Sequence, residues 1–264
     1  MNYKLLFSTY RNRYRFVQSS LDKYVSDQKV SKALNLGTGE GDYDPMIAPY
    51  CHQLIGCDIN EGDIEFAQQL NADIPQLSYQ VENALRLSFK AEEFSLLISV
   101  EVMEHVGDPE QMTREIGRVL RPGGLAIITF PQTNFPWTYD PINKLAGKRL
   151  IGQGAYAFGH DYLVNVAAFK SWAERYGLEV LEERALSGHF VGLSEMYWTG
   201  WIQRIFKDNS GNANSKSPRK GKLRPSRKAP LLVGITDFFT RFDYWLFGRS
   251  KQSVGRGFVL RKRD

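Results

Sequence analysis

The sequence is poor in cysteine and lacks long apolar runs. Among 264 residues there are two cysteines, Cys51 and Cys57, whose spacing fits neither a disulfide framework nor a zinc site. We expect both to be buried thiols in a reducing compartment, the cytoplasm. No run of about 18 apolar residues is present, so we expect no membrane-spanning helix. The first residues lack an apolar stretch followed by a small-residue cleavage site, so we expect no secretory signal.

One stretch of the chain lacks acidic residues. Residues 216–228 read KSPRKGKLRPSRK and contain seven basic residues and no acid, while the whole chain has a net charge of +5. The rest of the chain is therefore slightly acidic. Basicity confined to one segment disfavours nucleic acid as a partner and indicates a local attachment segment.

From about residue 30 onward, apolar runs typical of strands alternate with segments of helical periodicity. This alternation predicts βαβ units, a parallel sheet and right-handed crossovers. We expect a tight turn at RPGG, residues 121–124. The expected strands are 32–37, 53–59, 77–83, 94–102, 125–130, 178–186 and 256–263, and the expected helices are 42–51, 61–70, 109–120 and 166–177.

A glycine-rich loop, LNLGTGEGD, covers residues 34–42 at the end of the first expected strand. Glycine lets backbone N–H groups approach a ligand where a Cβ atom would clash. The dinucleotide spacing G-x-G-x-x-G fails because its third glycine position is Asp42, and a carboxylate there would repel phosphate. Asp58, near the end of the second expected strand, can accept both hydroxyls of a ribose. The loop therefore predicts an adenosine ligand without phosphates.

Five segments in order resemble the motifs of class I S-adenosylmethionine (SAM)-dependent methyltransferases, closest in pattern to ubiquinone-biosynthesis O-methyltransferases. They are ALNLGTGEG, LIGCDIN, VENALRLSF, FSLLISVEVMEHV and EIGRVLRPGGLAIITFP. The resemblance implies an α/β, Rossmann-like fold with a seven-stranded, mostly parallel sheet, an antiparallel last strand and an insertion between strands 6 and 7. We expect an N-terminal helical segment at 1–30, a methyltransferase core at 31–186, an insertion with a basic linker and amphipathic helix at 187–255, and the closing strand at 256–264.

The resemblance also implies that SAM lies across the carboxyl ends of strands 1 and 2. Asn35 and Asn83 stand where the family usually has acidic residues. An amide oxygen still accepts a hydrogen bond, so we expect weakened cofactor binding. The expected cofactor-binding residues are Asn35, Gly37, Thr38, Gly39, Gly41, Asp58, Ile59, Asn83, Ala84 and Ser99.

The segment EVMEHV is the expected place of the chemistry. Glu101, Glu104 and His105 are spaced i, i+3, i+4 and would share one face of a helical turn. With His160 as a fourth ligand they could hold a divalent cation such as Mg²⁺, as a similar E-x-x-E-H does in small-RNA 2′-O-methyltransferases. Alternatively, His105 or His160, with Glu104 nearby, acts as a metal-free catalytic base. A third interpretation is that Glu104 and His105 only order the helix and line the pocket.

Residues 231–247, LLVGITDFFTRFDYWLF, place eight apolar residues on one helical stripe and polar residues opposite. Together with the basic tract, residues 216–247 predict attachment to an anionic membrane surface. The alternative is that the stripe packs on the edge of the sheet.

The sequence thus predicts a SAM-dependent methyltransferase that acts on a small or lipid-linked acceptor, at oxygen, on a quinone-like aromatic or a glycan hydroxyl. The alternatives are a nicotinamide-dependent oxidoreductase and a non-catalytic, membrane-associated adaptor that retains the fold. We expect the protein in the cytoplasm, peripheral on the inner membrane face.

Overall fold

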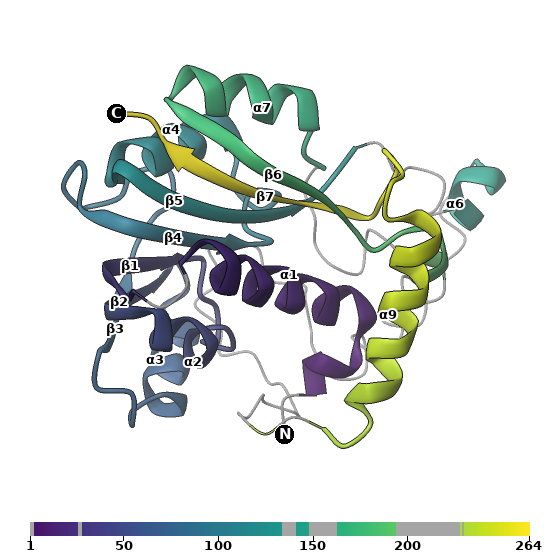
Figure 1. Ribbon diagram of the computed structural model, residues 1–264, viewed down its shortest axis with the longest axis horizontal. Coiled ribbons are helices and arrows are strands. Elements are labelled where there is room, and N and C mark those ends of the chain that lie inside the picture. The colour runs from purple at the N-terminus through teal and green to yellow at the C-terminus, as the bar shows by residue number, and fades with distance from the viewer. Residues whose placement is uncertain (1–2, 26–27, 134–140, 148–162, 194–227, 229) are drawn as a thin grey trace.

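A seven-stranded sheet forms the centre of the protein (Figure 1). The computed structural model describes residues 3–25, 28–133, 141–147, 163–193, 228 and 230–264. The strand order is β3-β2-β1-β4-β5-β7-β6, with β7 antiparallel to both neighbours and the other pairs parallel. This confirms the predicted fold. The strands are β1 (Val30–Leu36), β2 (Cys51–Asp58), β3 (Leu77–Val81), β4 (Phe94–Val100), β5 (Leu120–Pro131), β6 (Leu178–Leu186) and β7 (Gly255–Lys262).

Helices bury apolar residues against both faces of the sheet. One cluster joins Ile116 of α4 and Phe169 of α7 to strand residues, and the other joins Phe16 and Leu21 of α1 to residues of the opposite face. Each inner strand is therefore covered on both sides, as its continuous apolar run predicts. The helical elements are η1 (Tyr3–Leu6), α1 (Ser8–Tyr24), α2 (Asp44–Ile47), η2 (Ala48–Tyr50), α3 (Glu61–Leu70), α4 (Pro109–Val119), α6 (Pro141–Ala146), α7 (Val166–Arg175) and α9 (Val233–Phe247).

The predicted helices begin at residues suited to that role. The Asn60 side chain accepts hydrogen bonds from the N–H groups of Gly62 and Asp63 at the start of α3. Asp108 does the same for Gln111 at the start of α4, directly before Pro109. These caps satisfy N–H groups that lack a partner within the helix. The segment 42–51, expected as one helix, is split into the short elements α2 and η2.

Residues 121–124, expected as a tight turn, belong to the beginning of β5. Pairing with β4 steps from Leu120 opposite Phe94 to Leu125 opposite Leu96, so the intervening residues are displaced from the regular ladder. Gly123 has φ +74° there, a conformation that glycine adopts easily. The glycines therefore form an irregularity within the strand and do not separate it from α4.

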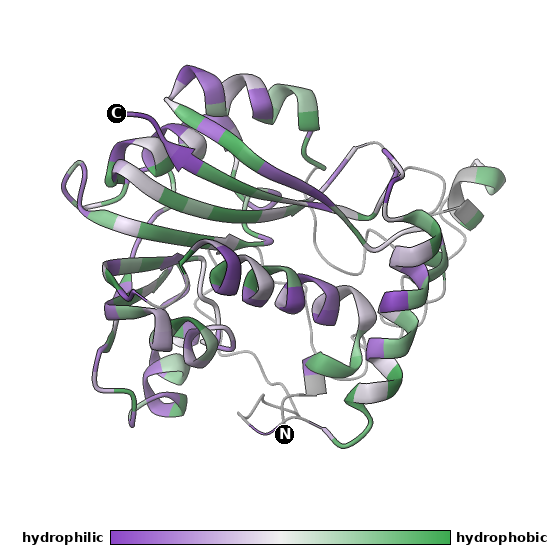
Figure 2. Cartoon of the chain, viewed as in Figure 1, coloured by the Kyte–Doolittle hydropathy of each residue, from purple (hydrophilic) through white to green (hydrophobic). Residues whose placement is uncertain are grey.

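α9 lies beside α1 and η1 (Figure 1). The alternative that its apolar stripe packs on the sheet edge is wrong, because residues of this stripe such as Phe238 and Trp245 are exposed while the polar Thr240 and Asp243 are buried. Figure 2 shows that α9 is rich in apolar residues, as are the central strands. Unlike the strands, the helix does not turn them inward.

The chain reverses its direction of sheet growth between β1 and β4, which are neighbours in the middle of the sheet. In open α/β sheets, ligands bind outside the carboxyl ends of the strands at such a point. The glycine loop follows β1, Asp58 ends β2, and Glu101 follows β4. All three predicted parts of the site therefore meet at this edge.

Candidate cofactor and active site

The glycine loop turns sharply out of β1. Gly37, Gly39 and Gly41 all have positive φ, at +77°, +53° and +79°. A Cβ atom on Gly37 would lie 2.1 Å from Val102 Cγ2, and one on Gly41 would lie 2.7 Å from Asn71 Nδ2. A Cβ atom on Gly39 would meet nothing within 4 Å. The first and third glycines are thus required by close packing, while the second has open space where a side chain would stand, so a ligand can approach its Cα atom.

Asp58 is held by backbone N–H groups. Its Oδ2 accepts from the Gly39 N–H at 2.9 Å and its Oδ1 accepts from the Asn60 N–H at 2.9 Å. These bonds fix the carboxylate beside the glycine loop, and each oxygen keeps a second lone pair for a hydroxyl. This geometry suits the predicted role of Asp58 with a ribose. Ile59, which follows it, is exposed.

A buried polar network lies beneath the loop. Asn35 Nδ2 donates to Asp44 Oδ1 at 2.6 Å, while Thr38 Oγ1 and the Tyr79 hydroxyl donate to Asp44 Oδ2 at 2.6 and 2.8 Å. Asn71 Nδ2 donates to the Tyr79 hydroxyl at 2.7 Å and to the Gly41 carbonyl at 3.0 Å. Asp44 is wholly buried, which raises its pKa, while these donors oppose the rise.

Sequence reasoning missed Asp44 and Tyr79. It noted that Asn35 replaces an acidic residue, but the structure places an acid against Asn35 from nine positions along the chain. The charge is therefore present under the loop, on a different residue. The signal in the sequence was the Asp-Pro pair that opens α2.

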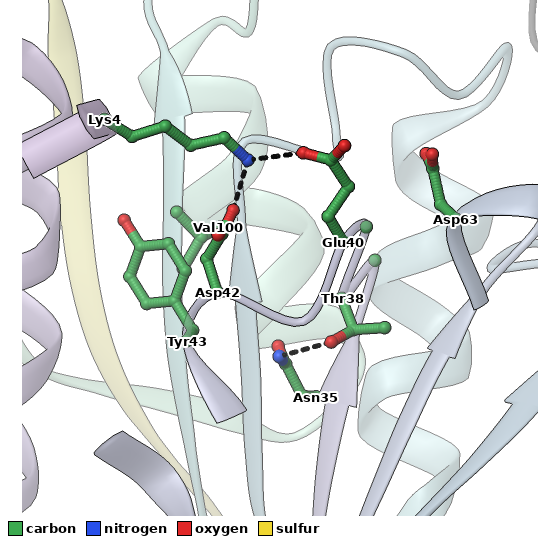
Figure 3. A pocket seen from close by; sticks show the side chains of 10 residues that line it. Lys4, Asn35, Thr38, Glu40, Asp42, Tyr43, Asp63 and Val100 are labelled. Atoms are coloured by element: carbon green, nitrogen blue, oxygen red, sulfur yellow. Dashed lines mark hydrogen bonds and ion pairs between the residues drawn. The ribbon is translucent and has the colours of Figure 1, made fainter. Parts of the chain in front are cut away.

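A cavity of about 150 Å³ opens above the loop (Figure 3). Lys4 of η1 reaches across it, with Nζ 2.9 Å from Glu40 and also paired with Asp42. Burial lowers the pKa of Lys4, but the two carboxylates outweigh burial and raise it above its ordinary value. Because Lys4 neutralises Asp42, this carboxylate repels a phosphate less than the sequence predicts. The lining residues are Lys4, Asn35, Gly37, Thr38, Gly39, Glu40, Asp42, Tyr43, Asp63 and Val100.

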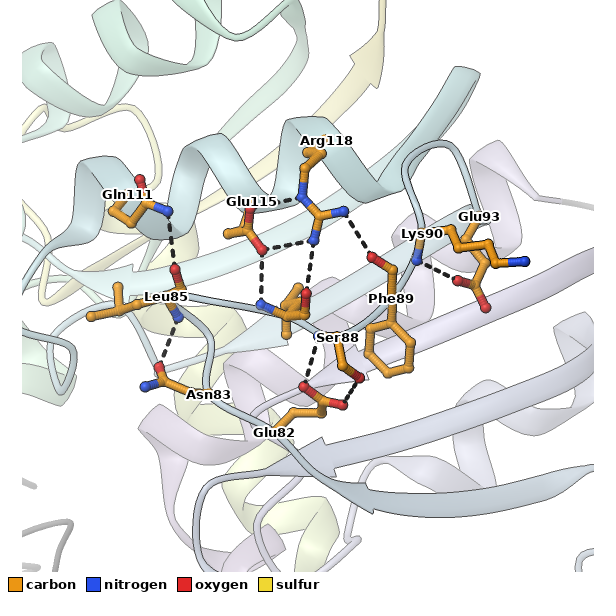
Figure 4. A network of polar contacts seen from close by, with 11 residues as sticks. Glu82, Asn83, Leu85, Ser88, Phe89, Lys90, Glu93, Gln111, Glu115 and Arg118 are labelled. Carbon is orange, nitrogen blue, oxygen red and sulfur yellow. Dashed lines mark hydrogen bonds and ion pairs between the residues drawn. The ribbon is translucent and has the colours of Figure 1, made fainter.

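The segment after β3 is anchored to α4 (Figure 4). Glu115 accepts from the Leu87 N–H at 2.8 Å, and Arg118 donates to the Phe89 carbonyl at 2.7 Å. These contacts hold the segment that begins with Asn83. Asn83 Oδ1, the atom expected to receive the adenine amino group, accepts from the Leu85 N–H at 2.9 Å.

The remaining two predicted cofactor residues have little exposed surface. Ala84 belongs to the core cluster, and Ser99 is buried within β4 next to Val100, which lines the cavity. Their burial does not show whether they contact the cofactor, so the roles of Ala84 and Ser99 stay predictions.

The expectation that Glu101, Glu104 and His105 share a helical face is wrong. Residues 101–108 form turns, and α4 begins only at Pro109. Glu101 has φ +54°, and its carboxylate accepts from Arg13 Nη1 at 2.8 Å and from Thr129 Oγ1 at 3.0 Å. The carboxylate is thus tied to α1 and β5. Arg13 was not foreseen, since it lies 88 positions away in sequence.

Glu104 and His105 are neighbours with different environments. Glu104 is wholly buried, whereas 42% of the His105 side chain is exposed, with Nε2 3.9 Å from Glu104 Oε1. Burial raises the pKa of Glu104 well above its ordinary value, and the charge of Glu101 raises it further. An exposed imidazole beside a buried carboxyl can exchange a proton with a bound molecule.

Three of the four predicted metal ligands can be judged. Within the described residues, no three His, Cys, Asp or Glu side chains are grouped so that they could hold a metal ion. The cation bound by Glu101 is Arg13, and a guanidinium in that place opposes a divalent ion. These three residues do not fit a metal site. His160 lies outside the described residues.

The described residues fit the cofactor SAM. The open face of Gly39, the fixed carboxylate of Asp58 and the cavity beside them provide a place for an adenosine with a short polar tail. A seven-stranded sheet of this order with such a loop after β1 defines a class I SAM-dependent methyltransferase fold.

Comparisons with known proteins support this fold. Residues 34–128 match a family described as "Methyltransferase domain". A "Ubiquinone biosynthesis O-methyltransferase" of Coxiella burnetii is 27% identical over 63% of this chain and 73% of its own. The structure of N-methyltransferase NodS from Bradyrhizobium japonicum with S-adenosyl-L-homocysteine (SAH) matches at a TM-score of 0.52, with 19% identity over 70% of this chain and 83% of its own. The structure of the [4+2]-cyclase SpnF matches at a TM-score of 0.56, with 13% identity over 94% of this chain and 80% of its own.

The family match to residues 34–128, these relatives and the fold together support a class I SAM-dependent methyltransferase. The oxidoreductase and adaptor alternatives are therefore set aside. The structural neighbours named above include an N-methyltransferase and a cyclase, so their shared fold does not define the acceptor.

Proposed function

We propose that the protein methylates a hydroxyl oxygen of a small or lipid-linked acceptor, either a quinone-like aromatic or a glycan hydroxyl. The curated relative from C. burnetii, named for ubiquinone biosynthesis, supports an oxygen acceptor at a distance of 27% identity. The observation that carries the proposal is the position of His105. It follows β4 on the same turn as Val102, which packs against Gly37 of the cofactor loop.

In the proposed reaction SAM supplies an electrophilic methyl group. A hydroxyl oxygen forms the new bond to carbon while the bond from sulfur breaks, and the hydroxyl proton must be removed. His105 accepts that proton through its exposed imidazole. Glu104 Oε1 lies 3.9 Å from His105 Nε2, and in its ionised form this carboxylate stabilises the imidazolium that forms. Arg13 and Thr129 hold Glu101 and so fix the turn that carries both groups.

The test is transfer of labelled methyl from SAM to a panel of catechols, hydroquinones and glycans, with product analysis by mass spectrometry. His105→Gln should lower kcat by about 10²–10⁴-fold, the range for loss of a general base, and leave the affinity for SAH unchanged. His52→Gln, at an exposed histidine near the start of β2, is the matched control and should retain activity. Full activity of His105→Gln would exclude it as the base. Products methylated only on nitrogen or carbon would contradict the proposed acceptor.

Adding a chelator to the same assay distinguishes a metal-dependent reaction from one in which His105 is a metal-free base. If Glu101, Glu104, His105 and His160 hold a divalent ion, EDTA should abolish turnover and Mg²⁺ should restore it. We expect turnover to be unchanged by EDTA, because the Glu101 carboxylate already forms an ion pair with Arg13.

We also propose that the protein associates peripherally with an anionic membrane face, where a lipid-linked acceptor would be met. The support is the basic tract 216–228 followed by α9. Among the described helices, none has the length and apolar character needed to cross a bilayer.

A further inference from the structure

α9 is oriented with its polar side toward the protein. Asp243 and Thr240 are 1% and 3% exposed, whereas Phe238 and Trp245 are 65% and 77% exposed. In a helix on a protein surface the apolar stripe normally faces the core. Here it faces away. We call this stripe the outward face; its residues are Ile235, Phe238, Phe239, Phe242, Trp245 and Leu246.

Specific polar contacts fix this orientation. Asp243 accepts hydrogen bonds from the N–H groups of Gly188, Phe190 and Val191. Thr236 Oγ1 donates to the Leu6 carbonyl at 3.1 Å. Hydrogen bonds from backbone N–H groups to a buried carboxylate are among the stronger ones in proteins. Rolling the helix to bury the outward face would break all of these contacts and expel a charge that they satisfy.

Arg11 of α1 adds a further contact on the same side. It binds Asp237 through Nε at 2.7 Å and Nη2 at 3.1 Å. Both acidic residues of α9 are therefore engaged toward the protein. The solvent side of the helix carries apolar side chains and one cation, Arg241.

The outward face is a continuous aromatic surface. The ring centroids of Phe238 and Phe242 are 6.3 Å apart, and those of Phe242 and Trp245 are 6.1 Å apart. Phe190, from the segment after β6, extends the surface with centroids 5.8 Å from Phe239 and 5.9 Å from Phe242. Exposed apolar surfaces of this continuity mark sites of interaction.

Basic residues surround the outward face. Lys228 precedes the helix, Arg241 lies on it, and Arg249 and Lys251 follow it, all exposed. The sequence places six further basic residues at positions 216–227. A twofold contact between two copies would bring these like charges together, which is unfavourable. An apolar face framed by cations is instead complementary to a surface with an anionic exterior and an apolar interior.

We propose that the outward face of α9 is an in-plane docking surface for an anionic lipid bilayer, into which Phe238 and Trp245 insert. The inference deepens the proposed function and rests on it in one respect, since it names the surface by which the enzyme reaches a lipid-linked acceptor. An in-plane helix binds through its buried apolar side chains and through attraction of its cations to acidic lipids.

The test is co-sedimentation of the full chain with two kinds of vesicle. One kind contains phosphatidylcholine alone, and the other contains phosphatidylcholine with about 30% phosphatidylglycerol. Phe238→Gln/Trp245→Gln keeps the charge of the chain and replaces two exposed side chains. It should reduce the partition coefficient on anionic vesicles by about tenfold or more, as expected for two lost aromatic insertions. Val180→Gln, at an exposed apolar residue of β6, is the matched control and should bind like the native chain.

Arg241→Gln/Arg249→Gln tests the electrostatic part, and should reduce binding to anionic vesicles with little effect on neutral ones. Equal binding of the native chain and the Phe238→Gln/Trp245→Gln variant would overturn the proposal, and would assign any binding to the basic tract alone. Absence of native binding to anionic vesicles would also overturn it. Light scattering that shows a native dimer and a monomeric variant, without lipid binding, would reassign the face to a second copy of the chain.

Titration with SAH and turnover of a water-soluble acceptor separate this proposal from the proposed function. A variant that loses vesicle binding but retains both supports docking. A native chain that binds vesicles but methylates no hydroxyl would contradict the proposed function and leave docking standing.

Discussion

Exchanging Asn35 and Asp44 tests whether the buried acid under the glycine loop can reside on either residue. The two side chains are joined by a hydrogen bond of 2.6 Å, and both are buried. Asn35→Asp alone would place a second carboxylate against Asp44. Asn35→Asp together with Asp44→Asn would restore one carboxylate and one amide with their positions exchanged.

The expected magnitude for Asn35→Asp follows from electrostatics. Two unit charges about 4 Å apart repel by about 4 kcal/mol at an effective dielectric constant of 20. Taking up a proton limits the loss, because protonating a carboxyl of ordinary pKa at pH 7 costs about 4 kcal/mol, and burial has already raised the pKa of Asp44. We expect a decrease of about 2–4 kcal/mol in the free energy of unfolding, or about 5–15 °C in Tm for a chain of this length.

The double variant should recover most of this loss. The new amide at position 44 can donate to the carboxylate at position 35 and still accept from Thr38 or Tyr79. One hydrogen bond to the original carboxylate is weakened, so we expect it to lie within about 1 kcal/mol of the native chain. Asp44→Asn alone completes the double-mutant cycle, which isolates the coupling between the two positions.

The assay is thermal and chemical unfolding of all four chains from pH 4 to 8, with SAH titration as a check on the loop. In Asn35→Asp the folded pair has a carboxyl pKa raised above the unfolded value. The stability deficit should therefore be largest at high pH and shrink as the pH falls and the pair takes up a proton. A single variant as stable as the native chain at pH 7, or a double variant no better than the single one, would refute this reasoning.

Three further outcomes are expected. Asp58→Ala should weaken SAH binding by about 10–100-fold in calorimetry, the loss of hydrogen bonds to a charged group, and unchanged affinity would exclude Asp58 from the ribose site. Lys4→Ala should lower the free energy of unfolding by about 1–3 kcal/mol, because Asp42 and Glu40 lose their cation, while Lys4→Arg should lose less. Glu104→Gln should gain stability relative to the native chain as the pH rises above 4.5 in unfolding experiments. Because the pKa of Glu104 is raised in the folded state, its contribution to the free energy of unfolding is complete below the unfolded-state pKa and is lost as the pH rises through the folded-state pKa. A difference that does not vary with pH would mean that this pKa is not raised.

Much of the fold could be predicted because its signals are local. Apolar runs such as those of β4 and β5 mark strands buried on both faces, and Asn60 and Asp108 cap helices within a few residues of themselves. The glycine loop and Asp58 were also identified from neighbouring residues. Their proximity in space follows from the parallel pairing of β1 with β2.

The rest of the site depends on contacts that sequence spacing does not encode. Lys4 pairs with Glu40 from 36 positions away, and Arg13 pairs with Glu101 from 88 positions away. The helical spacing of Glu101, Glu104 and His105 suggested a shared face, but Glu101 leaves β4 in a positive-φ turn. The tie to Arg13 and Thr129 accompanies this turn, and neither partner lies near it in sequence.

α9 shows why periodicity alone cannot orient a helix. The pattern of residues 231–247 correctly predicted two faces. The apolar face turns inward only if no residue of the polar face makes specific contacts with the rest of the protein. Asp243 meets three backbone N–H groups that begin at Gly188, 55 positions away, and these groups need an acceptor when they are buried. Satisfying them turns the carboxylate inward, and the geometry of the helix then turns Phe238 and Trp245 outward. The exposed aromatic surface is thus a consequence of the same contacts that hold the helix against α1, which is why removing its aromatic residues should leave the fold intact.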